Sequence, residues 1–77
     1  MQTVESTPEH MAVGFARLLR QLDIPAPLHA VLTFMQSLAL VGIDDRNAVY
    51  WAARSTLVHR HENIVLFDKA FAVFWEH

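Results

Sequence analysis

Apolar side chains recur along the chain at intervals of three and four residues, the spacing that places them on one face of a helix. We expect four helices, at about residues 8–22, 28–40, 45–58 and 62–76. No stretch alternates apolar and polar side chains over a useful length, so no sheet is expected. The pattern predicts an all-α fold, a compact four-helix domain with short loops over residues 7–77, preceded by a flexible N-terminus of residues 1–6.

Polar residues stand where the first and third helices should begin. Ser6 or Thr7 can accept the free backbone N–H groups of the first helix, and Pro8 suits its first turn. Asp44 or Asp45 can do the same for the third helix. Both starts therefore have a capping residue.

Proline and glycine mark the predicted helix ends. The prolines of segment 23–27 end the first helix, because each lacks an N–H and pushes its predecessor out of the helical conformation. Gly42 suits the left-handed residue that often ends a helix. Gly14 lies inside the first helix and weakens it by about 1 kcal/mol relative to Ala. Its lack of a side chain would let another helix approach closely.

The periodic positions predict the core. They are Met11, Phe15, Leu18, Leu19 and Leu22 in the first helix; Leu28, Val31, Leu32, Met35, Leu38 and Ala39, widened by Phe34 and Val41, in the second; Val49, Ala52, Ala53, Thr56 and Leu57 in the third; and Ile64, Phe67, Ala70, Phe71, Phe74 and Trp75 in the fourth. Leu66 and Val73 lie off the main stripe of the fourth helix. Its apolar face is therefore wider than the ~100° of an ordinary surface helix.

Composition narrows the class of protein. Seventy-seven residues allow one domain, and 53% of them are apolar, which favours a packed or associating domain over disorder. Cysteine is absent, so no disulfide or thiolate metal site is expected. The formal net charge is −2 and the six Lys and Arg are scattered, which disfavours a nucleic-acid partner.

Neither a membrane nor a secretory route is indicated. The longest apolar runs are far shorter than the about 20 residues of a spanning helix. Residues 1–5 have neither a basic segment nor an apolar run, so no signal peptide is expected. These features predict a cytoplasmic protein.

No catalytic, cofactor or metal site is expected. His59, His61 and Glu62 form the one local group of metal-ligand type, but a zinc site needs three or four converging ligands, and a solvated turn explains these residues better. No serine lies in a nucleophile motif, and two glycines cannot build a phosphate-binding loop. We therefore expect a protein that is not an enzyme.

Arg54 and Asp68 each lie beside the inner stripe of their helix. Antiparallel packing of the third and fourth helices could bring them together as a partly buried ion pair that sets the register of the two helices. The sequence equally allows the alternative that Arg54 and Asp68 are two separate, solvated surface charges.

Several short motifs, taken in order, match one family. They are FARLLR at 15–20, IP at 24–25, VGI at 41–43 with Arg46, VYWAAR at 49–54 with TLV at 56–58, and LFDKAF at 66–71 with FW at 74–75. This order and spacing resembles the N-terminal helical region of CoxE-like proteins, which carry a von Willebrand factor A domain further along. The resemblance covers residues 13–75.

The resemblance implies a partner. CoxE-like proteins work beside MoxR-type AAA+ ATPases and help to mature metalloenzymes such as carbon monoxide dehydrogenase. The family's Asp-x-Ser-x-Ser metal motif belongs to the von Willebrand domain and does not occur here, so no metal role is carried over to any residue. We expect either the helical part of a longer protein or a small stand-alone relative.

The resemblance and the apolar last helix together predict a protein-interaction module. Leu66, Val73, Phe74 and Trp75 are the candidate contact residues. Their partner would be the ATPase or the von Willebrand domain. Trp75 lies near the end of the sequence, where an apolar ring needs cover, so a homodimer is the alternative.

Overall fold

The computed structural model describes residues 7–75. Within them the chain forms α1 (Pro8–Gln21), α2 (Leu28–Val41), α3 (Arg46–Leu57) and α4 (Ile64–Trp75), with a short 3-10 helix, η1 (His61–Asn63), leading into α4. The predicted all-α, four-helix fold is confirmed. Residues 1–6, for which flexibility was expected, lie outside the described residues. No helix in the described part is long and apolar enough to cross a membrane.

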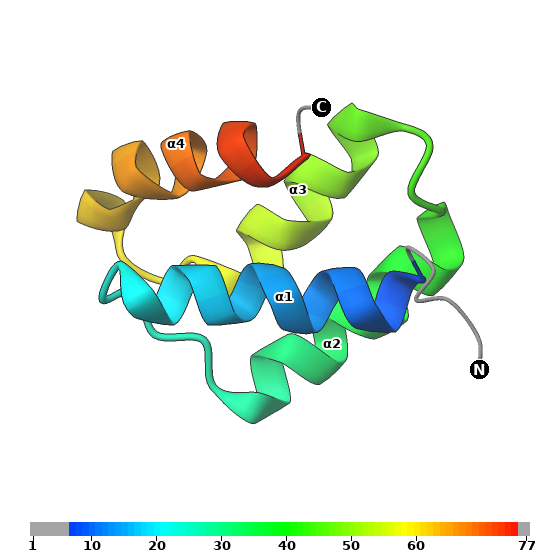
Figure 1. The fold of residues 1–77 in the computed structure, drawn as a ribbon, viewed down its shortest axis with the longest axis horizontal. Helices are drawn as coiled ribbons and strands as arrows, with labels where there is room; N and C mark the ends of the chain where they lie inside the picture. Colours follow the sequence, from blue (N-terminus) through cyan, green and yellow to red (C-terminus); the bar gives the residue numbers. More distant parts are fainter. Residues whose placement is uncertain (1–6, 76–77) are drawn as a thin grey trace, which may run out of the picture.

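The helices pack as a closed ring of neighbours. α4 lies alongside α1 and runs in the opposite direction, so the start of α1 and the end of α4 share one end of the molecule (Figure 1). α2 packs against α1, and α3 packs against both α2 and α4. The apolar faces of all four helices therefore meet in one core.

Phe15 of α1 occupies the middle of that core and is fully buried. Its ring contacts Phe34 of α2 at a centroid distance of 6.3 Å, and Phe67 and Phe71 of α4 at 5.7 and 6.0 Å. The two α4 contacts are edge-to-face, the arrangement that aligns the positive edge of one ring with the negative face of another. Phe15 thus joins three helices.

The end of α1 is held by a Schellman motif. The N–H of Ile24 donates to the carbonyl of Leu19 at 2.9 Å, and the N–H of Asp23 donates to that of Arg20 at 3.0 Å. Asp23 has φ +65°, the left-handed conformation that glycine usually supplies at this position. Ile24 is buried, so the motif returns the chain to the core before Pro25.

Two of the predicted capping residues are the actual caps. The Thr7 hydroxyl accepts the backbone N–H of His10 at 3.2 Å. One carboxylate oxygen of Asp45 accepts the N–H groups of Asn47 and Ala48 at 3.1 and 3.2 Å. Each cap satisfies donors that have no partner inside the helix.

α2 presents a different face to the core from the one expected. Its buried side chains are Ala30, Val31, Phe34 and Leu38. Leu28 and Leu32, which were assigned to the core, are 70% and 46% exposed, and Ala39 is exposed as well. α2 contains no Asp, Glu, Lys or Arg and is apolar over most of its circumference, so periodicity alone could not select its buried side. Packing against α1 and α3 selects it.

Glycine allows α1 and α4 to approach closely, as expected from Gly14. A Cβ atom at Gly14 would lie 3.2 Å from the Cζ atom of Phe74. The Phe74 ring also contacts Phe15, with centroids 5.3 Å apart. The missing side chain therefore makes room for an aromatic ring of α4.

Asp23→Gly should stabilise the domain by about 0.5–1 kcal/mol, because glycine adopts the left-handed conformation without steric cost. Asp44→Gly is the matched control. Asp44 is not among the described residues with positive φ, so glycine there should be neutral or destabilising. Urea denaturation of both variants measures the free energies of unfolding. Equal effects at the two positions would contradict a conformational cost at Asp23.

Gly14→Ala should stabilise a Phe74→Ala variant by about 1 kcal/mol through helix propensity. In the wild-type background the gain should be clearly smaller, because the Phe74 ring must move away from the new methyl group. Thermal or urea denaturation of the four proteins gives the difference. The same gain in both backgrounds would show that the ring does not restrict position 14.

Candidate interaction surface

The Tyr50 hydroxyl links α3 to α4. It donates a hydrogen bond to a carboxylate oxygen of Asp68 at 2.6 Å and accepts one from Nη1 of Arg54 at 3.3 Å. The sequence suggested a direct Arg54–Asp68 ion pair. Within residues 7–75 the two side chains instead meet at the same phenol oxygen, without a direct pair. A register link between the helices therefore depends on Tyr50.

Its surroundings keep the Tyr50 phenol protonated. Partial burial raises the pKa of Tyr50 above its ordinary value of 10.0, the hydrogen bond to Asp68 raises it further, and Arg54 lowers it in part. At neutral pH the phenol is therefore a hydrogen-bond donor. It cannot act as a general base there.

The cations of α3 lie over aromatic rings. The guanidinium of Arg54 lies 5.0 Å from the centroid of the Trp51 ring, and that of Arg46 lies 5.4 Å from the Phe71 centroid. Such contacts stabilise by about 0.5–1 kcal/mol where they are exposed. They hold both guanidinium groups against the protein and give the outer side of α3 a mixed aromatic and cationic character.

A depression of about 410 Å³ lies beside the Tyr50 link. Its lining residues are Arg46, Asn47, Tyr50, Asp68 and Phe71. None of these is a serine, cysteine or histidine, so the lining does not pair a nucleophile with a neutral base. Across the described residues, no three His, Cys, Asp or Glu side chains lie close enough together to hold a metal ion.

The four candidate contact residues divide into two pairs. Leu66 and Val73 are exposed, at 38% and 68%. Phe74 and Trp75 are half-buried and pack against the core of the same chain. The Trp75 ring stacks on Phe71 at a centroid distance of 5.7 Å. That any of the four contacts a partner stays a prediction.

The indole N–H of Trp75 is buried and has no hydrogen-bond acceptor among the described residues. Burying such a donor costs about 1–3 kcal/mol. The half-buried Trp75 ring also contacts the rings of Phe15, Phe71 and Phe74, and these contacts favour its burial. The apolar body of Trp75 therefore sets its position.

Sequence reasoning missed a second apolar surface, on α2. Its exposed large side chains are Leu28, Leu32, Leu40 and Val41, and Leu40 is 87% exposed. The absence of Asp, Glu, Lys and Arg from α2 was the available signal. A helix that is apolar over most of its circumference has more apolar surface than one small core can cover.

Tyr50 should titrate above pH 10, and Asp68→Asn should lower its pKa by removing the carboxylate that accepts its proton. Above pH 10 the unfolded chain loses the phenol proton before the folded chain does, so the free energy of unfolding should fall as the pH rises. Tyr50 is the single tyrosine, so the ultraviolet absorbance of tyrosinate reports it alone. Tyr50→Phe is the control for the pH dependence of stability. An unchanged pKa in Asp68→Asn would exclude the hydrogen bond as a cause.

Comparison with known proteins agrees with this architecture. The family model of the CoxE N-terminal helical bundle domain matches residues 12–77, which include the whole of α2, α3 and α4 and most of α1. No curated protein and no solved structure matches the chain. Since the match extends over most of the sequence, the resemblance seen in the short motifs is confirmed, and the chain belongs to the CoxE N-terminal helical bundle family.

Proposed function

We propose that this domain is a non-catalytic protein-interaction module of a CoxE-like protein. Its partner would be a MoxR-type AAA+ ATPase engaged in metalloenzyme maturation, and the outer face of α4 would make the contact. Membership of the CoxE family supports the choice of partner. The exposed apolar side chains of α4 are the single observation on which the choice of surface rests.

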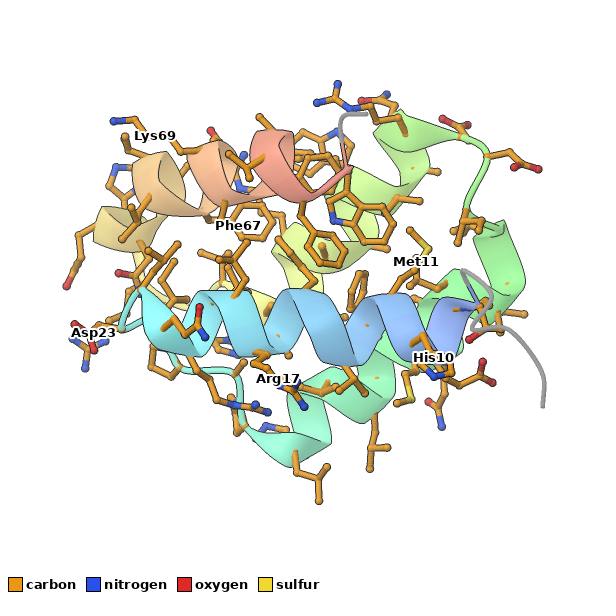
Figure 2. All side chains as sticks on the ribbon, in the orientation of Figure 1. His10, Met11, Arg17, Asp23, Phe67 and Lys69 are labelled. Carbon is orange, nitrogen blue, oxygen red and sulfur yellow. The ribbon has the colours of Figure 1, made fainter. Side chains whose placement is uncertain are left out.

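The outer face of α4 has the properties of a docking surface. Val65 and Val73 are 67% and 68% exposed, and Leu66 lies beside them. Figure 2 shows Phe67 on the side of α4 that faces α1 and Lys69 on the opposite side. The inner side of the helix is held in the core, so its outer side is a rigid apolar strip with one positive charge. Rigid apolar surfaces lose little entropy on binding.

Other classes of function have less support. The depression beside Tyr50 has no nucleophile paired with a neutral base, which argues against hydrolysis or group transfer. The chain has eight Asp and Glu and only six Lys and Arg, which argues against a nucleic-acid partner. A protein-interaction module is the class of function that the exposed apolar side chains of α4 support.

Homodimerisation through α2 is the second candidate. An interface around a two-fold axis brings the same residues of both copies together, so like charges would repel each other there. α2 contains no Asp, Glu, Lys or Arg, and Leu28, Leu32 and Leu40 are exposed. A pair of α2 helices could therefore meet without placing like charges opposite one another.

Val73→Glu should weaken binding to a MoxR-type ATPase at least about tenfold, because it buries a charge in an apolar contact. Leu40→Glu is the matched control: it also replaces an exposed aliphatic side chain by Glu, but on α2, at a site that is 87% exposed. Isothermal titration calorimetry with the ATPase measures both. An equal loss in both variants, or no binding by the wild type, would refute the proposal for α4.

Sedimentation of the same proteins tests the second candidate. A wild-type dimer at micromolar concentration that Leu40→Glu converts to a monomer would support the α2 interface. A dimer that only Val73→Glu disrupts would assign self-association to α4 instead. A wild-type monomer would exclude homodimerisation at that concentration.

A further inference from the structure

A second surface pocket, of about 280 Å³, lies where the chain turns from α3 into α4. We call it the elbow pocket; six of its lining residues are Trp51, Arg54, Val58, His59, Arg60 and His61. The backbone is extended at Val58 and Arg60, so this connection runs outside the helices before η1 begins. Figure 1 shows it as the yellow segment that leads to the start of α4.

Basic side chains concentrate at the elbow pocket. Two arginines and two histidines line it, although the chain as a whole has a net charge of −2. Glu62 is the neighbouring carboxylate, and it lies 3.6 Å from Arg60. Both side chains of that pair are more than two-thirds exposed. Solvent screens such a pair, so Arg60 can exchange Glu62 for another carboxylate at little cost.

Arg54 is held in place with unused donors. Its guanidinium lies over the Trp51 ring and donates to the Tyr50 hydroxyl. A guanidinium has five N–H donors, and described residues accept one hydrogen bond from Arg54. Because the group is already oriented, binding a carboxylate there would immobilise little further side-chain freedom.

Apolar surface accompanies these charges. Trp51 is 54% exposed, and Val58 and Ile64 also line the pocket. Exposed tryptophan and arginine side chains are enriched among residues that dominate binding energy at protein interfaces. The pocket thus offers an aromatic face, aliphatic walls and two guanidinium groups within one small concave site.

We infer that the elbow pocket binds an acidic segment of a partner protein. A carboxylate of that segment pairs with Arg60 and Arg54, and a neighbouring apolar side chain packs on Trp51. This inference goes beyond the proposed function, because the pocket shares no residue with the outer face of α4. A nucleic acid would supply anionic phosphates but no aliphatic side chain for Val58 and Ile64, and the net negative charge of the chain opposes it.

The test uses two short fluorescein-labelled peptides and measures fluorescence anisotropy. In one, Glu residues flank a single Leu, and in the other Gln replaces every Glu. The wild-type protein should bind the Glu peptide more tightly than the Gln peptide. Arg60→Gln should weaken that binding by about threefold, as for an exposed charge pair. Trp51→Ala should weaken it by about tenfold or more, as for a central aromatic contact.

Arg17→Gln is the matched control for charge. Arg17 is exposed and lies on the side of α1 away from α4 (Figure 2), so its loss should leave binding unchanged. Equal binding of the two peptides would overturn the inference, and so would an equal effect of Arg17→Gln and Arg60→Gln. Tighter binding of an oligothymidylate probe than of the acidic peptide would assign the pocket to nucleic acid instead.

Val73→Glu separates the two proposals. It should leave peptide binding at the elbow pocket unchanged while it weakens binding to the ATPase. Loss of peptide binding in that variant would show that the outer face of α4, and not the elbow pocket, holds the peptide. If the wild-type protein does not bind the ATPase, the proposal for α4 fails, but peptide binding would still support the inference for the elbow pocket.

Discussion

The contact of the Phe15 ring with the aromatic rings of α4 is the constraint from which most of the structure follows. α1 and α4 are far apart in sequence, and this contact closes the ring of helices that begins with α1 and α2. Edge-to-face packing fixes the relative orientation of the rings as well as their distance. Gly14 allows the contact to continue to the end of α4, where the Phe74 ring lies over the glycine. A methyl group at position 14 would press on the Phe74 ring, which would have to shift by a few tenths of an ångström.

That packing also decides which surfaces remain for partners. With Phe67 and Phe71 turned inward, the opposite side of α4 faces solvent, and Val65 and Val73 are exposed there. The hydrogen bond from Tyr50 to Asp68 joins α3 to α4. The elbow pocket forms where these two helices are joined, so its shape depends on the same contacts. The core and the candidate binding surfaces are therefore not independent of each other.

Interactions between residues close in sequence explain the helix starts and buried helix faces that could be predicted. Thr7, Pro8 and Asp45 begin helices because the capping interaction involves residues only two or three positions away. The stripes of α1 and α3 predicted their buried sides because polar residues occupy most of the exposed positions. In α4 the helical spacing of the aromatic residues predicted the buried side, although Val65, Leu66 and Val73 are apolar and exposed. Buried Phe15, Val49 and Phe67 were all among the expected core positions. For these segments a local pattern and the global fold agree.

The sequence by itself determined the class of fold, the approximate helices, most of the core and the family. It did not determine which side of α2 is buried or that the Tyr50 hydroxyl stands between Arg54 and Asp68. It assigned Phe74 and Trp75 both to the core and to a contact surface, and only the structure shows that they pack against their own core. Each of these depends on which atoms of distant residues meet. Periodicity places side chains around one helix axis, but the rotation of that helix against its neighbours comes from packing all four together. Where the apolar face of a helix is wider than the core can cover, as in α2, only the tertiary structure decides what it buries and what it leaves for a partner.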